Sequence, residues 1–166
     1  MGGELMELYL KQIRGPAPGY KVLDDRGVLL FTAAGLRKER KLVHIRNAEG
    51  LYTASVRVES GSAHAILYGI VGEDPHFVSV YEKDRRVGEF LRTEEGYAYE
   101  QRGLFAEVRG RGSLIRIRDR EGSLIASVSR IRFRRPDLYV MSIARRRSAF
   151  DVILMTLAVD LDCTRN

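Results

Sequence analysis

The sequence predicts a mainly β protein: a closed antiparallel barrel of about twelve strands that encloses a C-terminal hydrophobic helix. Three observations support this architecture. Short runs rich in Val, Ile, Leu, Tyr and Phe follow one another from residue 20 to residue 144, separated by Gly, Asp, Asn or Ser. Several of these breaks have the composition of hairpin turns. The runs are followed by a segment, 148–163, that is apolar on every side.

Twelve runs have the length and composition of β-strands, and no segment between them has the pattern of a long helix. The expected strands are Tyr20–Leu23, Val28–Ala34, Leu42–Arg46, Leu51–Val58, Ala63–Ile70, His76–Glu82, Val87–Thr93, Tyr97–Arg102, Leu104–Arg109, Leu114–Arg118, Leu124–Phe133 and Leu138–Ala144.

A turn motif, Asx-x-x-Gly, recurs between these strands at Asp24–Gly27, Asn47–Gly50 and Asp119–Gly122. The Asp or Asn side chain can accept hydrogen bonds from the turn backbone, and the glycine accepts a positive φ. The motif therefore predicts three β-hairpins, each with a type I turn followed by a bulge. A fourth turn, Lys83–Arg86, is expected without the glycine.

The third hairpin predicts a core face and a basic face. If Asp119 pairs with Ser123, Ile117 lies opposite Ile125, and side chains alternate along each strand. The face toward the core then holds Ile115, Ile117, Ile125, Ser127, Ile131 and Phe133, and the outer face holds Arg116, Arg118, Leu124, Arg130, Arg132 and Arg134.

The segment 148–163 is expected to be the central helix. Ser148 and Asp151 form a capping box at its start, and its length of about 24 Å suits the depth of a barrel. A buried strand is the alternative, because several of its residues are β-branched. Eleven or twelve strands leave room for an axial helix, whereas eight do not. The helix core is expected at Phe150, Ile153, Leu154, Leu157 and Leu161.

Positive charge is concentrated in the last third of the chain. The net charge is +6, yet residues 101–147 hold 13 arginines and only four acidic residues. Such a face either contacts anions or is simply a solvated wall. The arginines that would contact an anion are Arg116, Arg118, Arg130, Arg132, Arg134, Arg145, Arg146 and Arg147.

The sequence offers no catalytic constellation. Three scattered histidines, His44, His64 and His76, lack any metalloprotease or hydrolase motif. The single cysteine, Cys163, excludes an internal disulfide and is expected to be a core residue. Asp160 and Asp162 either pair with arginines at the barrel mouth or lie beyond the last turn of the helix; a carboxylate pair for acid/base chemistry is a remote third alternative. We expect no enzyme activity, no cofactor and no metal site.

The chain 1–166 is expected to form one domain with a flexible start, residues 1–7, and to be a monomer. It has no apolar run of the length that spans a bilayer, and acidic residues replace the basic ones of a secretory signal. These features favour a cytoplasmic protein that can also lie at the periphery of a membrane.

Four segments, Leu8–Gln12, Tyr20–Gly27, Lys41–Gly50 and Asp151–Cys163, together resemble the LURP-one-related proteins. This resemblance implies the tubby C-terminal-like fold, a twelve-stranded barrel around a hydrophobic helix, which is distantly similar to the phospholipid scramblases. It also implies a non-enzymatic binding or scaffold module that contacts anionic phospholipids or phosphoinositides through the arginine-rich face. Scrambling itself is not expected, because the chain has no membrane anchor and no cysteine cluster.

Nucleic-acid binding through the same basic face is the alternative function. It is less expected than lipid binding, because the face lacks the interleaved aromatic residues that stack on bases. An enzyme of unrecognised type is a third possibility, and the sequence names no protein partner.

Overall fold

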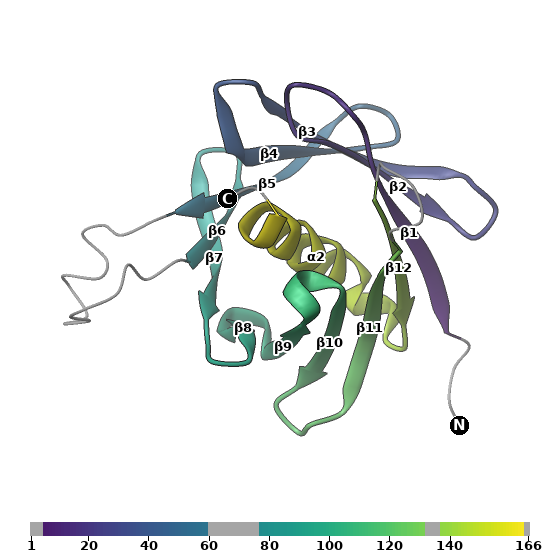
Figure 1. Ribbon diagram of the computed structural model, residues 1–166, viewed down its shortest axis with the longest axis vertical. Helices are drawn as coiled ribbons and strands as arrows, with labels where there is room; N and C mark the ends of the chain where they lie inside the picture. Colours follow the sequence, from purple (N-terminus) through teal and green to yellow (C-terminus); the bar gives the residue numbers. More distant parts are fainter. Residues whose placement is uncertain (1–4, 60–76, 132–136, 165–166) are drawn as a thin grey trace.

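Twelve strands form a closed ring around one helix in the computed structural model, which describes residues 5–59, 77–131 and 137–164 (Figure 1). The strands are β1 (Met6–Gln12), β2 (Gly19–Asp24), β3 (Leu29–Leu36), β4 (Glu39–Asn47), β5 (Tyr52–Glu59), β6 (Phe77–Glu82), β7 (Arg85–Arg92), β8 (Gly96–Tyr99), β9 (Leu104–Arg109), β10 (Leu114–Asp119), β11 (Leu124–Ile131) and β12 (Leu138–Ile143). Three short 3-10 turns, η1 (Glu100–Arg102), η2 (Gly110–Gly112) and η3 (Arg146–Ser148), lie between them and before the helix α2 (Ala149–Thr164).

The strands follow one another around the ring in chain order, and each pairs antiparallel with its neighbours. The ring closes where β1 pairs with β12, from Met6 opposite Ile143 to Lys11 opposite Leu138. Closure leaves no unpaired strand edge in the ring. The predicted fold class, a closed antiparallel barrel of about twelve strands around a C-terminal helix, is confirmed.

The three predicted Asx-x-x-Gly turns are present. Gly27, Gly50 and Gly122 have φ of 80°, 82° and 83°, the left-handed conformation that glycine adopts without strain. In the third turn, the Asp119 carboxylate accepts hydrogen bonds from the backbone N–H groups of Glu121 and Ser123, each at 3.0 Å. The fourth turn, between β6 and β7, places Lys83 at a φ of 56°.

Each of these three hairpins contains a second irregularity, one residue pair beyond the turn. The register shifts between Val22 and Leu23, between Ile45 and Arg46, and between Ile117 and Arg118. One residue of the returning strand is thereby left without a partner, and in the third hairpin that residue is Ile125. Ile117 therefore lies opposite Ala126, not opposite Ile125 as the sequence predicted.

The helix α2 occupies the inside of the ring (Figure 1). Every residue from Val152 to Asp162 is buried, which agrees with the absence of a polar stripe. Ile153, Leu154, Leu157 and Leu161 lie in the core as predicted. Phe150 is only partly buried and packs against the Phe31 ring, with 5.4 Å between ring centroids.

The boundaries of the helix and of the N-terminal segment differ slightly from expectation. The helix begins at Ala149, directly after Ser148, and includes Asp160 and Asp162, so these two residues do not lie beyond it. The first strand begins at Met6, so residues 6 and 7 of the segment expected to be flexible belong to the barrel.

Strand β1 was not among the predicted strands, although it closes the ring. Among the other predicted segments, Ala63–Ile70 falls outside the described residues. The expected strand Tyr97–Arg102 is divided into the short strand β8 and the turn η1. The number of strands predicted is therefore the number observed, but not all of them are the same segments.

Candidate functional site

Two of the arginines predicted to contact anions, Arg116 and Arg118, are exposed on the outer face of β10. Arg118 lies opposite Phe105 of β9 and Leu124 of β11, and cross-strand partners project to the same side of a sheet. Both apolar neighbours are exposed, Phe105 by 38% and Leu124 by 43%. This face therefore presents cationic side chains beside large apolar ones.

Arg146 and Arg147 are exposed in η3, which lies beside the same hairpin. The preceding residue, Arg145, links the two regions through an ion pair of 2.6 Å with Asp119 in the β10–β11 turn. Hydrogen bonding from Arg145 and from the turn backbone holds the pKa of Asp119 below its ordinary value. Arg145 is thus engaged within the protein, while its two neighbours in η3 face solvent. We call Phe105, Arg116, Arg118, Leu124, Arg146 and Arg147 the basic outer face.

Arg130 does not belong to the basic outer face, which corrects the sequence prediction. The extra residue Ile125 reverses the alternation along β11, so Ala126, Val128 and Arg130 are buried while Ser129 is exposed. Arg130 is only 7% exposed. Arg132 and Arg134, predicted on the same wall, lie outside the described residues.

Arg130 is inserted beside η2 and Tyr139. Its Nη2 donates a hydrogen bond of 3.3 Å to the backbone carbonyl of Arg111, and its Cζ lies 6.0 Å from the centroid of the Tyr139 ring. Its Nε and Nη1 are buried and have no hydrogen-bond partner among the described residues. Such unsatisfied buried donors are rare in folded proteins and call for an explanation.

Asp160 lies in the same interior region, near the end of α2. Its carboxylate accepts hydrogen bonds from the hydroxyl of Tyr139, at 2.6 Å, and from the hydroxyl of Tyr20. Gln12 Nε2 approaches the same carboxylate at 3.5 Å. We call Gln12, Tyr20, Arg130, Tyr139 and Asp160 the interior cluster.

Burial is the main cause that raises the pKa of Tyr139, and the charge of Asp160 acts in the same direction while Arg130 opposes it. Tyr139 therefore stays protonated and keeps donating to Asp160. Two residues further along α2, Asp162 accepts a hydrogen bond from the Tyr97 hydroxyl. In the described contacts, tyrosine hydroxyls donate hydrogen bonds to both carboxylates, an arrangement that the sequence analysis did not predict.

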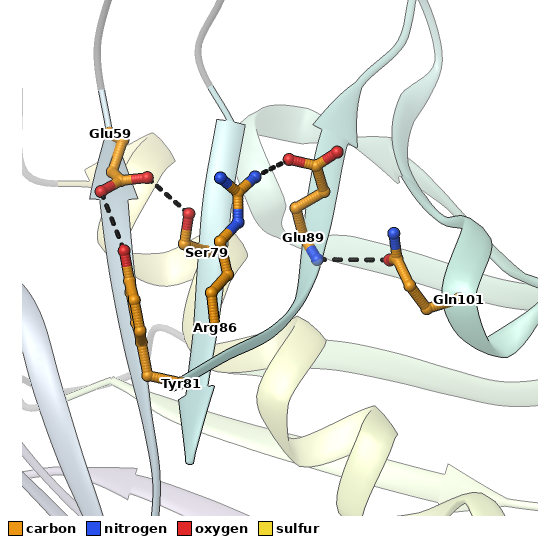
Figure 2. A network of polar contacts seen from close by, with 6 residues as sticks. All are labelled: Glu59, Ser79, Tyr81, Arg86, Glu89 and Gln101. Atoms are coloured by element: carbon orange, nitrogen blue, oxygen red, sulfur yellow. Dashed lines mark hydrogen bonds and ion pairs between the residues drawn. The ribbon is translucent and has the colours of Figure 1, made fainter. Parts of the chain in front are cut away.

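A second polar network lies on the outer side of β5, β6 and β7 (Figure 2). The Glu59 carboxylate accepts hydrogen bonds from Ser79 Oγ at 2.5 Å and from the Tyr81 hydroxyl at 3.2 Å. Next to it, Arg86 forms an ion pair with Glu89 and lies over the Phe77 ring, with 5.3 Å from Cζ to the centroid. We call Glu59, Ser79, Tyr81, Arg86 and Glu89 the exterior network.

His44 also takes part in an outer polar contact. Its Nδ1 lies 2.6 Å from Ser55 Oγ, which in turn lies 2.8 Å from the Tyr52 hydroxyl. A serine and a histidine at this distance resemble a nucleophile and a base, yet the site lies on regular strands whose backbone N–H groups are used by the sheet. His64, His76 and the side chain of Cys163 lie outside the described residues.

Sequence reasoning missed the tyrosines of the interior cluster and the apolar part of the basic outer face. Tyr20 and Tyr139 were counted only as strand residues. A signal was present, because Asp160 stands in an otherwise apolar segment, and a buried carboxylate requires hydrogen-bond donors from the surrounding strands. Within the described ranges, no helix is long and apolar enough to cross a bilayer, and no group of His, Cys, Asp and Glu side chains has the makings of a metal site.

The fold defines the class of protein to which the chain can be compared. A closed twelve-stranded barrel around a C-terminal helix is consistent with the tubby-like barrel fold. The X-ray structure of protein AT5G01750 from Arabidopsis thaliana, a LURP-one-related protein, matches the chain with a TM-score of 0.59 and 12% sequence identity. The match covers 94% of this chain and 91% of that chain. The comparison with family models finds no match, and neither does the comparison with curated proteins.

This similarity shows a shared fold at low sequence identity. The LURP-one-like barrel that the sequence predicted is therefore confirmed as a fold.

Proposed function

We propose that the protein is a non-catalytic binding module that attaches to anionic phospholipid surfaces through the basic outer face. The observation that carries the proposal is the pairing of exposed arginines with exposed large apolar side chains across β9, β10 and β11. A peripheral membrane contact uses these two components, because basic residues are attracted to anionic headgroups and apolar side chains enter the headgroup region.

The two arginines of β10 in the basic outer face, Arg116 and Arg118, are not neutralised by a carboxylate among the described residues. Arg116 lies opposite Glu107 of β9, but the Glu107 carboxylate is bound by Arg109, with 2.7 Å to Nε and 2.6 Å to Nη2. Arg118 donates from Nη1 to the Gly122 carbonyl at 3.1 Å, and this bond leaves its charge without a carboxylate partner among the described residues. Both guanidinium groups can therefore be offered to headgroup phosphates.

Vesicle flotation tests the proposal. The full chain should bind vesicles of phosphatidylcholine with phosphatidylserine better than vesicles of phosphatidylcholine alone, and binding should weaken as salt increases. The double variant Arg116→Gln/Arg118→Gln should weaken binding about 30-fold, because each basic residue near an anionic surface contributes about 1 kcal/mol. Leu124→Ala should weaken it further through lost apolar insertion.

Arg46→Gln is the matched control. Arg46 holds the equivalent place in the β4–β5 hairpin, where its Nη1 donates to the Gly50 carbonyl at 3.3 Å, six strands away around the ring. Equal loss of binding in Arg46→Gln, or equal binding to neutral vesicles, would contradict a contact at the basic outer face.

A mobility-shift assay with single- and double-stranded oligonucleotides at about 0.15 M salt tests the alternative function, which is nucleic-acid binding. Among the described members of the basic outer face, Phe105 is the aromatic residue that could stack on a base. Binding of an oligonucleotide that exceeds vesicle binding, and that the double variant abolishes, would reassign this face to nucleic acid.

A further inference from the structure

Arg130 is exceptional among the buried polar side chains of the described residues. Among the described residues, the buried side-chain nitrogen and oxygen atoms without a hydrogen-bond partner are Nε and Nη1 of Arg130. The buried carboxylates and hydroxyls around Arg130 all have hydrogen-bond partners. Nε and Nη1 carry three of the five N–H groups of a guanidinium. Hydrogen-bonding capacity of a permanently charged group is thus available inside the barrel.

The charge of Arg130 is unpaired as well. No ion pair within 4 Å joins it to a carboxylate of the described residues, and Asp160, the acidic member of the interior cluster, accepts hydrogen bonds from Tyr20 and Tyr139. The Tyr139 ring, 6.0 Å from Cζ, compensates part of the charge through its π face. Arg130 also interacts with the Tyr139 hydroxyl and opposes the rise of its pKa. Nε and Nη1 have no hydrogen-bond partner among the described residues, so this part of the guanidinium still lacks an acceptor.

Arg130 lies buried near one end of the barrel. Arg130 stands one residue before the end of β11, and Tyr139 one residue after the start of β12, close to the C-terminal turns of α2. The backbone carbonyl of Arg111 in η2 fixes Nη2 and thereby orients the remaining N–H groups. The guanidinium is preorganised by contacts that leave most of its donors unused.

We propose that Arg130 forms an oxyanion-binding site at this end of the barrel interior, and that the site takes the phosphate group of a small phosphorylated molecule or of a lipid headgroup. Phosphate supplies several acceptor oxygens and a full negative charge, which are the two things that the guanidinium lacks. Because neighbouring side chains cover Nε and Nη1, binding requires these side chains to move, and we expect slow association. The site is separate from the basic outer face and does not depend on its function.

Thermal unfolding of the full chain in inorganic phosphate is the first test, with chloride at equal ionic strength as the reference. Phosphate should raise the Tm of the protein in a saturable way, since a ligand that binds the folded state stabilises it. Arg130→Met should abolish this rise, and Arg86→Met, which removes an exterior arginine, should keep it. A phosphate effect of the same size in Arg130→Met would overturn the proposal.

A second measurement covers the case in which Arg130→Met does not fold. The buried Nε–H of Arg130 should give a protected ¹⁵N–¹H signal, which the charge-conserving variant Arg130→Lys identifies by its absence. Titration of the unmodified protein with phosphate should shift this signal to saturation. A signal that does not move at phosphate concentrations that alter exposed arginine signals would count against the site.

The source of the phosphate is separated by two further arms. A rise in Tm with glycerol 3-phosphate in solution indicates that the site takes a small phosphorylated molecule. A rise in Tm with phosphatidic acid vesicles, and not with glycerol 3-phosphate, indicates that it takes a lipid headgroup. The double variant Arg116→Gln/Arg118→Gln should keep the response to inorganic phosphate even where it loses vesicle binding. If Arg130→Met loses the response to inorganic phosphate and the double variant loses vesicle binding, the two proposals can be judged separately.

Discussion

The interior cluster and the exterior network use the same groups in two different environments. In each, a carboxylate accepts hydrogen bonds from two hydroxyls, Tyr20 and Tyr139 for Asp160 inside, and Ser79 and Tyr81 for Glu59 outside. In each, an arginine lies over an aromatic ring. The difference lies in the charge balance, because Arg86 outside has a carboxylate partner and Arg130 inside has none among the described residues.

This difference predicts how much the loss of a polar contact should lower the free energy of unfolding in each place. Outside, Ser79 is buried, but Glu59, Tyr81, Arg86 and Glu89 keep part of their surface in water, so the loss of a contact there should cost less. Inside, a lost partner leaves a group desolvated and unsatisfied, at a cost of about 1–3 kcal/mol, or more if the group is charged. Substitutions that break a satisfied contact of the interior cluster, such as those to Asp160, should therefore lower stability more than substitutions in the exterior network.

The largest effect is expected for a charge placed in the hydrophobic core of the barrel. Leu154→Arg, at a position 2% exposed on α2, should abolish folding, because an unpaired buried charge costs several kcal/mol and a domain has only about 5–15 kcal/mol in reserve. Leu51→Arg, at a position 64% exposed, is the control and should unfold like the unmodified protein in urea. A soluble and cooperatively folded Leu154→Arg variant would show that α2 is not enclosed.

A matched pair of amide substitutions tests the comparison directly. Asp160→Asn should lower the free energy of unfolding by about 3 kcal/mol, since two hydrogen bonds to a charged group are weakened inside the barrel. Glu59→Gln changes the same chemistry outside and should lower it by less than about 1 kcal/mol. Both values come from urea denaturation, and similar losses in the two variants would remove the distinction between the environments.

The two arginines, Arg130 inside and Arg86 outside, should respond differently to replacement by methionine. In buffer without phosphate, Arg130→Met should leave the free energy of unfolding unchanged or raise it by about 1 kcal/mol, because an unpaired buried charge is replaced by an apolar side chain of similar length. Arg86→Met should lower it slightly by removing a paired surface charge. A loss of several kcal/mol in Arg130→Met would mean that the protein itself satisfies the guanidinium.

The smallest effect is expected for the exterior ion pair between Arg145 and Asp119, and it should depend on pH. The pKa of Asp119 is held low in the folded protein, so its ionised form binds Arg145 and stabilises the fold above the ordinary aspartate pKa. This stabilisation disappears as the pH falls through the lowered pKa. Arg145→Gln should therefore be slightly less stable than the unmodified protein at neutral pH and equal to it in strong acid, as measured by urea denaturation, with Arg146→Gln unchanged throughout.

Much of the fold could be predicted because its signals are local. The three Asx-x-x-Gly turns depend on the residues of the turn itself, and an apolar segment without a polar stripe must be surrounded wherever it lies. Strand β1 gives a weaker signal, because its role depends on pairing with β12 at the other end of the chain. The sequence of β1 alone does not indicate which distant strand it pairs with.

The candidate site was less predictable, because it depends on where one extra residue is accommodated. The bulge at Ile125 reverses the two faces of β11 and moves Arg130 from a supposed outer wall to the interior. The turn sequence predicts a bulge at Gly122, but not a second one a few residues later. Exposure of Phe105 and Leu124 likewise depends on the final register of three strands.

The ring is sealed by strands from opposite ends of the described chain, β1 and β12, and the helix that fills it comes afterwards. During synthesis, all twelve strands therefore emerge before the helix that fills the barrel. Until α2 emerges, the inward side chains of all twelve strands have only one another to pack against. Such long-range dependence slows folding and exposes apolar surface on the way, so assembly of this protein is expected to be late and highly cooperative.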